Sequence, residues 1–311
     1  MNGESLAVRV RGLRKSYNGV RAVRGIDLDI RTVEIFALLG PNGAGKTTTV
    51  EILEGYRRRD RGEVTVLGLD PERQRTRLRG RVGIVLQKTG VDRYLKVEET
   101  IRLFASYYPR PRPVDEVIEL VGLTEKRNAR VTTLSGGQLR RLDMAVSLVG
   151  DPDLLFLDEP TTGFDPSARR EAWEVVKNLA SLGKTVLLTT HYMDEAQYLA
   201  DHVAVIAGGR IVATGTPDTL GRRNMASARI RYRDPDGLAP PGVAGSDGYC
   251  ELRSDNPVRD LYLLTKWALD NDIDLVGLEV TRPTLEDVYL SLTAAPNGAA
   301  GRAAAPRRGA R

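Results

Sequence analysis

The stretch Gly40-Pro-Asn-Gly-Ala-Gly-Lys-Thr47 lies between an apolar run, Ile35–Leu39, and a helical pattern, Thr47–Tyr56. Its glycines allow successive backbone N–H groups to face one anion, and the helix after it presents a positive N-terminus. Lys46 would contact the β- and γ-phosphates and the Thr47 hydroxyl would bind Mg²⁺. A glycine-rich turn that only caps a helix is the alternative, which the order strand, loop, helix disfavours. The predicted phosphate cradle consists of Gly40, Pro41, Asn42, Gly43, Ala44, Gly45, Lys46, Thr47 and Thr48.

Four short apolar runs are each followed directly by a polar or glycine-rich segment. They are Ile35–Leu39, Val82–Leu86, Leu154–Leu157 and Val186–Thr190. Such runs indicate buried strands of a parallel sheet, with helical patterns between them. Ligands of open α/β sheets bind outside the carboxyl ends of the strands. We therefore expect the residues after these runs to converge on one site.

Two acidic residues, Asp158 and Glu159, follow the third of these runs. At a strand end Asp158 can hold Mg²⁺, often through water, and Glu159 is placed to polarise an attacking water molecule. Two acids after an apolar run also often cap the next helix, so this pair alone does not decide between the two interpretations.

The segment Leu134-Ser-Gly-Gly-Gln138 precedes a helix that we expect to begin near Gln138. It predicts a second anion-binding helix N-terminus. One nucleotide needs a single phosphate cradle within its own subunit. A second cradle, formed by Ser135, Gly136, Gly137 and Gln138, is explained if it closes over ATP held by another subunit.

With all these motifs in order, residues 6–215 resemble the nucleotide-binding subunit of an ATP-binding cassette (ABC) transporter. The resemblance implies an α/β P-loop NTPase fold with a RecA-like core and a helical subdomain, using ATP and Mg²⁺. It implies that Tyr17 stacks on adenine and that Asp165 is the D-loop aspartate. It further implies the catalytic residues Glu159, His191 and Gln87, and the magnesium-site residues Thr47, Gln87 and Asp158.

Two of these side chains could instead have a purely structural role. Tyr17 could be a packing tyrosine, and His191 a buried capping histidine. Two positions depart from the family pattern: Val33 stands where a turn glycine is usual, and Phe164 replaces a leucine of the D-loop. Neither departure alters a phosphate-contacting group, so we expect hydrolysis to be intact.

The chain divides into three predicted regions. Residues 1–216 form the cassette, with a helical subdomain at about 88–150. Residues 217–297 form a small α+β domain, and 298–311 a disordered tail rich in Ala and Arg. In the small domain we expect strands at Ser227–Arg233, Tyr249–Ser254 and Asp274–Thr281, helices at Pro257–Asp270 and Thr284–Thr293, and a loop at Gly237–Gly248.

The segment from Arg282 to Leu290 is similar to the closing helix of ATP-binding subunits of bacterial daunorubicin-type drug exporters, and Gly163-Phe-Asp-Pro166 fits the same group. The resemblance implies a second ATP-binding subunit, expected to be another copy of this chain. It also implies a separate permease of about six helices, each needing about 20 apolar residues to span the membrane.

Composition excludes several classes of protein. The 311 residues carry a net charge of +5, but four of these charges belong to arginines after residue 298, so a nucleic-acid partner is not expected. The single cysteine excludes a disulfide framework and a cysteine-rich zinc site. No run long enough to span a membrane and no signal peptide is evident, so we expect a cytoplasmic protein, peripheral on the inner face of the cell membrane.

The sequence thus predicts an ATP-hydrolysing subunit that energises export of a hydrophobic drug, lipid or related compound. The alternative is a soluble ABC ATPase that regulates a partner or remodels nucleic acid or ribosomes. Against remodelling stand the single P-loop and the 112 positions from Lys46 to Asp158, which hold no coiled-coil array. The transported substrate would be chosen by the permease and cannot be read from this chain.

Overall fold

The computed structural model describes residues 5–86, 90–223, 228–233, 243–244 and 248–281. The chain forms two compact units, Met1–Arg223 and Asn224–Arg311. The first unit extends seven residues past the expected boundary at residue 216, because helix α8 (Pro217–Arg223) belongs to it. Leu220 of this helix is buried, and Thr216 and Thr219 exchange hydrogen bonds at its start.

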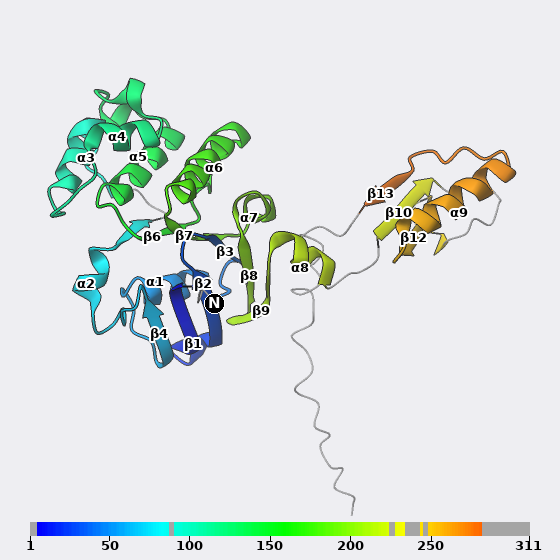
Figure 1. The fold of residues 1–311 in the computed structure, drawn as a ribbon, viewed down its shortest axis with the longest axis horizontal. Coiled ribbons are helices and arrows are strands. Elements are labelled where there is room, and N and C mark those ends of the chain that lie inside the picture. Colours follow the sequence, from blue (N-terminus) through cyan, green and yellow to red (C-terminus); the bar gives the residue numbers. More distant parts are fainter. Residues whose placement is uncertain (1–4, 87–89, 224–227, 234–242, 245–247, 282–311) are drawn as a thin grey trace, which may run out of the picture. The chain divides into compact units, whose positions relative to one another are not determined.

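The first unit is built on a six-stranded sheet of order β5-β6-β7-β3-β8-β9 (Figure 1). Five neighbouring strands, β5, β6, β7, β3 and β8, run parallel, and β9 is antiparallel to β8. The bounds are Ile35–Leu39 (β3), Val82–Val85 (β5), Leu154–Asp158 (β6), Thr185–Thr190 (β7), His202–Ala207 (β8) and Arg210–Gly215 (β9). The four strands expected from the sequence are adjacent, and the α/β fold class is confirmed.

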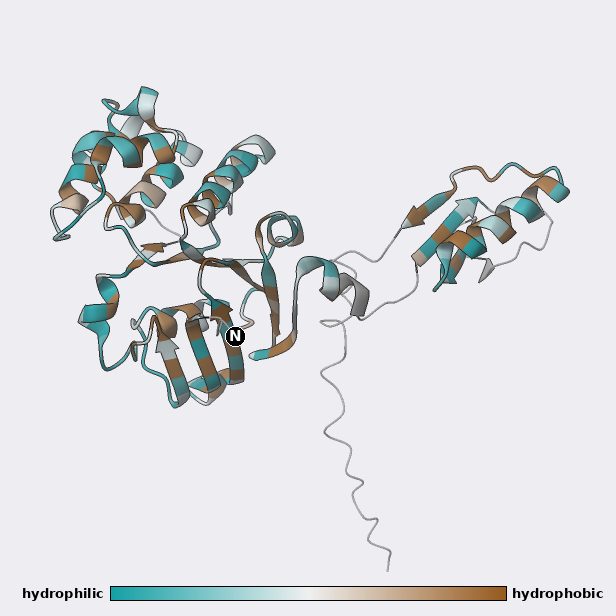
Figure 2. Ribbon diagram, in the orientation of Figure 1, coloured by the Kyte–Doolittle hydropathy of each residue, from teal (hydrophilic) through white to brown (hydrophobic). Residues whose placement is uncertain are grey.

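An antiparallel sheet of order β2-β1-β4 forms a second layer that the sequence analysis did not assign. Its strands are Leu6–Tyr17 (β1), Val20–Arg31 (β2) and Arg61–Val66 (β4). Apolar residues on one side of this sheet join helix α1 (Lys46–Leu53) and strands β3 and β6 in one buried cluster. The resulting contrast of apolar and polar positions along the strands is visible in Figure 2.

Between β5 and β6 the chain is helical. This region contains helices α3 (Val97–Ala105), α4 (Val114–Leu120) and α5 (Gly136–Leu148), with two 3₁₀ turns between α4 and α5, at Thr124–Lys126 and Val131–Thr133. In Figure 1 these helices lie on the other side of the six-stranded sheet from β1, β2 and β4. The remaining helices of this unit are α2 (Arg75–Arg79), α6 (Pro166–Ser181) and α7 (Met193–Leu199).

The second unit is a four-stranded antiparallel sheet of order β11-β12-β10-β13 with helix α9 (Pro257–Asp270). The strands are Ala228–Arg233 (β10), Val243–Ala244 (β11), Tyr249–Ser254 (β12) and Glu279–Thr281 (β13). Its buried core is Ile230, Tyr232, Cys250 and Leu264.

Two expectations for this unit were wrong in detail. The expected loop Gly237–Gly248 contains strand β11. The expected strand Asp274–Thr281 is shortened to β13, because the chain turns before it, with hydrogen bonds from Val276 N to Asp274 O and from Leu278 N to Leu275 O. The expected helix Thr284–Thr293 and the tail 298–311 lie outside the described residues. Within the parts that the structure describes, no helix is both long and apolar enough to cross a bilayer.

Candidate functional site

The loop from Gly40 to Gly45 joins β3 to α1, as its sequence predicts. Gly45 has φ of 106°, and a Cβ atom there would lie 2.6 Å from the carbonyl oxygen of Ala22. A Cβ atom on Gly40 would lie 2.4 Å from the carbonyl oxygen of Ile206. Both positions therefore require glycine. The first N–H groups of α1 have no partner within the helix, so they are donors for an anion at the loop.

Lys46 is the first residue of α1, and its side chain is only 5% exposed. Its Nζ donates to Gly40 O at 2.7 Å and to Pro41 O at 3.3 Å, so the side chain folds back over its own loop. The same Nζ lies 3.4 Å from Oε1 of Glu159. The loop thus holds a buried positive charge whose carboxylate partner comes from the end of β6.

The two acids after β6 are fixed by the neighbouring strand β7. Thr189 Oγ1 donates to Asp158 Oδ1 at 2.5 Å, and Glu159 N donates to Thr189 Oγ1 at 3.0 Å and to Thr189 O at 3.1 Å. Burial raises the pKa of Asp158. Glu159 has φ of 47°, a left-handed conformation that turns the chain immediately after the strand.

Glu159 lies between two nitrogen atoms: its Oε1 is 3.4 Å from Lys46 Nζ and 3.4 Å from His191 Nδ1. Burial by itself would raise the pKa of Glu159, but the charges of Lys46 and His191 and hydrogen bonds from Thr162 and Lys46 outweigh it, so the pKa is lowered. Glu159 is therefore an ionised carboxylate at neutral pH. The ring of His191, just after β7, packs on Tyr192 with ring centres 4.1 Å apart.

The convergence expected at the strand ends is therefore present for the residues after β3, β6 and β7. Gln87, the residue expected after β5, lies outside the described residues. Magnesium ions in nucleotide sites take one or two protein oxygens together with phosphates and water. The hydroxyl of Thr47, an exposed residue in the first turn of α1, and the carboxylate of Asp158 are a donor set of this kind.

The glycine-rich segment Ser135–Gln138 begins α5 two residues earlier than expected, at Gly136. Gln138 N donates to Ser135 Oγ at 3.3 Å, and Ser135 N donates to Gln138 Oε1 at 3.0 Å, which forms a capping box. A Cβ on Gly136 would meet nothing within 4 Å. Among the described residues no hydrogen bond or ion pair joins this segment to the loop at Lys46.

Among the described residues, no hydrogen bond or ion pair joins Lys46 to Asp165 or Tyr17, two further residues expected at the nucleotide site. Asp165 caps α6, with its Oδ1 accepting from Ser167 N and Ala168 N, both at 2.9 Å. Tyr17 ends β1, and its ring centre lies 5.4 Å from Lys15 Nζ and 5.4 Å from the Arg57 guanidinium carbon.

The sequence analysis missed Arg140, which is 7% exposed and ties α5 to the strand ends. Its guanidinium donates to Asp158 O and Pro160 O, both at 3.0 Å, and to Leu86 O. An arginine on the same face of α5 as buried Met144 was the signal that could have revealed it.

The analysis also missed Glu195, a fully buried carboxylate in α7. Its Oε1 accepts from Thr161 Oγ1 at 2.7 Å and from Trp173 Nε1 at 3.0 Å. Thr161 follows Glu159 by two residues, and Glu195 follows His191 by four. This carboxylate therefore joins the two segments that carry the candidate catalytic residues.

Comparison with known proteins agrees with this geometry. The model of the ABC transporter family matches residues 23–162, and that of the ABC transporter domain-containing protein-like C-terminal domain matches residues 228–284. The daunorubicin/doxorubicin resistance ATP-binding protein DrrA of Streptomyces peucetius is 38% identical, covering 93% of this chain and 93% of that protein. The Nod factor export ATP-binding protein I of Ralstonia nicotianae is 37% identical, covering 94% of this chain and 95% of its own.

Two solved structures show the same fold. One is cbiO1 from Clostridium perfringens, part of the ABC transporter complex cbiONQ, with 28% identity, a TM-score of 0.66, and coverage of 71% of this chain and 92% of that one. The other is the ATP-binding cassette MJ0796, in a dimeric post-hydrolysis state bound to ADP and Pi. It has 23% identity and a TM-score of 0.61, covers 67% of this chain and 98% of that one, and supports the fold alone.

Proposed function

This chain belongs to the ATP-binding subunits of the ABC transporter family, and from that premise we propose that two copies hydrolyse ATP at shared sites to drive export through a separate permease. The protein is an ABC ATPase. The observation that carries the proposed mechanism is the position of the Glu159 carboxylate, 3.4 Å from both Lys46 Nζ and His191 Nδ1 at the ends of adjacent strands.

Lys46 and the N-terminus of α1 hold the triphosphate, and Tyr17 stacks on adenine. In the structure Lys46 is paired with the Glu159 carboxylate and donates hydrogen bonds to two loop carbonyls. When ATP binds, phosphate oxygens replace these partners of Lys46. The phosphates carry more negative charge than the Glu159 carboxylate, and the backbone N–H groups of the loop can surround them. Glu159 then becomes free to accept a hydrogen bond from water, with His191 still beside its carboxylate.

Thr47, Asp158 and Gln87 are the residues proposed to surround Mg²⁺, which neutralises phosphate charge when bound. Thr189 orients the Asp158 carboxylate by its hydrogen bond, so one side of the metal site is preorganised by β7. His191, which directly follows the same strand β7, steadies the γ-phosphate. Positioning and charge neutralisation of this kind carry most of the catalysis in phosphoryl transfer.

The second copy supplies residues for which no hydrogen bond or ion pair to the Lys46 loop of their own copy is found among the described residues. We assign Ser135, Gly136, Gly137 and Gln138 to the ATP held by the partner, with Asp165 beside them. The capping box at the start of α5 supports this assignment, because it fixes the helix N-terminus while leaving the surroundings of Gly136 open. A head-to-tail pair of copies would contain two equivalent composite sites.

Export of a hydrophobic drug, lipid or related compound is the transport reaction that the relatives support. The names of two relatives refer to daunorubicin/doxorubicin resistance and to Nod factor export, and both proteins match this chain over more than nine-tenths of its length. The cargo would pass through a permease of about six spans, each of about 20 apolar residues. We place the ATPase on the cytoplasmic face of that permease.

The test compares two variants of the full chain. Glu159→Gln should bind ATP at least as tightly as the wild type while losing about 10²–10⁴-fold in turnover, since only the base is removed. Lys46→Ala should weaken ATP binding itself. Wild-type turnover in Glu159→Gln would refute the assignment of the base. Affinity purification from membranes would then show whether a polytopic membrane protein accompanies the chain, and recovery without one would favour a regulatory ATPase instead.

A further inference from the structure

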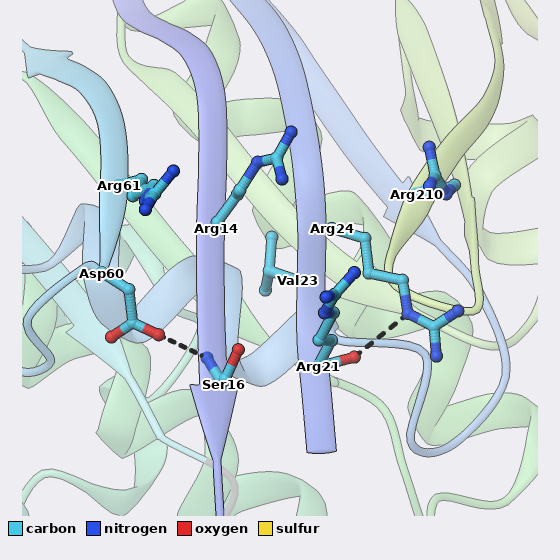
Figure 3. Close-up of a pocket in the computed structure, with 8 residues that line it drawn as sticks. All are labelled: Arg14, Ser16, Arg21, Val23, Arg24, Asp60, Arg61 and Arg210. Carbon is cyan, nitrogen blue, oxygen red and sulfur yellow. Dashed lines mark hydrogen bonds between the residues drawn. The ribbon is translucent and has the colours of Figure 1, made fainter. Parts of the chain in front are cut away.

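A pocket of about 410 Å³ lies on the polar side of the antiparallel sheet (Figure 3). Among its lining residues only Val23 is apolar. None of them belongs to the loop Gly40–Thr48 or to the acids after β6. The lining consists of Arg14, Ser16, Arg21, Val23, Arg24, Asp60, Arg61 and Arg210.

Five arginines thus reach one pocket from four strands, β1, β2, β4 and β9. The sheet register places Arg14 opposite Arg24 on one side and opposite Arg61 on the other. All three are exposed, and like charges directly opposite each other across strands destabilise a sheet. This row of arginines therefore opposes folding stability rather than supporting it.

The rest of the same sheet shows the usual balance of charge. Arg11 forms an ion pair with Asp29 at 2.6 Å, and Asp27 accepts from the backbone N–H of Gly12 at 2.6 Å. Within the pocket, by contrast, the lone carboxylate, Asp60, is held by Lys15 Nζ at 2.9 Å and by Ser16 N at 2.7 Å. Among the described residues, none of the five arginines forms an ion pair with a carboxylate.

We propose that this pocket, defined by Arg14, Arg21, Arg24, Arg61 and Arg210, is a second anion site that binds a compact ligand carrying several phosphate groups. Guanidinium groups bind phosphate in a bidentate manner, and a pocket of this volume is in the range of small-ligand sites. Neighbouring strands lie about 4.8 Å apart, so the row suits closely spaced charges rather than the spread carboxylates of an acidic peptide. Oligophosphates and phosphorylated lipid headgroups both present this chemistry.

Calorimetric titration with inorganic tripolyphosphate tests the site. Ser16 lines the pocket and is next to Tyr17, the residue proposed to stack on adenine. The full chain is therefore first saturated with a non-hydrolysable ATP analogue, so that tripolyphosphate cannot bind at the nucleotide site. Wild-type protein should bind tripolyphosphate, and the double variant Arg14→Gln/Arg24→Gln should bind about tenfold more weakly or worse, having lost two charge-assisted contacts. The matched control Arg9→Gln/Arg77→Gln removes the same charge from exposed positions outside the pocket and should bind like the wild type.

Vesicle flotation separates the two sources of phosphate. Binding to phosphatidylcholine vesicles only when they contain phosphatidylinositol 4,5-bisphosphate, whose headgroup carries several phosphates, and lost in Arg14→Gln/Arg24→Gln, would identify a lipid headgroup, whereas tripolyphosphate binding alone would identify a free anion. At low salt the double variant should unfold at the same temperature as the wild type or at a higher one, which shows that it is folded. Arg210→Gln, in the same pocket, is a second variant that should also weaken binding. Equal binding by wild type and both pocket variants, or no binding to either probe, would overturn the proposal.

Discussion

The buried carboxyl group of Glu54, at the end of helix α1, allows a quantitative test of how burial raises a pKa and thereby affects folding stability. This residue directly follows α1 and is 3% exposed. Burial, with smaller contributions from the charges of Asp158 and Glu51, raises the pKa of Glu54 from 4.5 to about 8. The substitution Glu54→Gln keeps the size and shape of the side chain and removes its titration.

The sign follows from the two protonation states. In the unfolded chain Glu54 loses its proton near pH 4.5, whereas in the folded chain it keeps the proton until about pH 8. The wild type should therefore lose stability as the pH rises through this window, and the variant should not. The rise in the pKa of Glu54 from 4.5 to about 8 corresponds to an upper limit of about 5 kcal/mol, and local relaxation should reduce the loss of stability to roughly 2–4 kcal/mol.

The assay is urea unfolding at pH 5 and pH 8, followed by tryptophan fluorescence. The chain has two tryptophans, one in each unit, so a Trp267→Phe background leaves Trp173 to report on the first unit. Glu54→Gln should exceed its background protein by less than about 1 kcal/mol at pH 5, just above the unfolded pKa, and by several times that amount at pH 8, while the control Glu51→Gln should show no such gain with pH. An equal difference at both pH values would refute the reasoning.

Three further outcomes are expected. Val33→Gly should stabilise the first unit by about 1 kcal/mol in urea unfolding, because Val33 has φ of 61°, a strained conformation for a β-branched residue; lower stability would contradict this. Thr161→Val should destabilise the protein by about 1–2 kcal/mol and lower turnover because it removes the bond to Glu195, whereas Thr161→Ser should retain both; equal behaviour of the two variants would count against this link. Deletion of residues 299–311 should leave the ATPase rate unchanged in a coupled assay, because none of the nucleotide motifs lies there, and a large loss would contradict this.

The parallel sheet could be read from the sequence because its strands are short apolar runs, each stopped by a polar or glycine-rich segment. The antiparallel sheet was missed for two physical reasons. Irregularities between Val10 and Leu13 interrupt the alternation of β1, and β4 pairs with β1 although it begins more than forty residues after β1 ends. The alternation of apolar and polar residues is a local signal. It reveals neither an irregular strand register nor pairing with a strand far away in the sequence.

The site could be predicted wherever topology alone decides it. Adjacent parallel strands bring Lys46, Asp158, Glu159 and His191 to one edge, as their places after the apolar runs indicated. The contact of Arg140 with the strand ends depends on how α5 packs in three dimensions, and no spacing in the sequence encodes that packing.

The central claim is that each ATP is hydrolysed between two copies, and a mixing experiment tests it most directly. Glu159→Gln removes the base, and Ser135→Asp places a negative charge where the partner's phosphate is expected while keeping an oxygen that can cap α5. Each variant alone should be inactive. In an equal mixture half of the pairs are mixed and hold one intact site of two, so the ATPase rate should recover to roughly one quarter of the wild-type rate. A mixture as inactive as its two components would contradict the shared site.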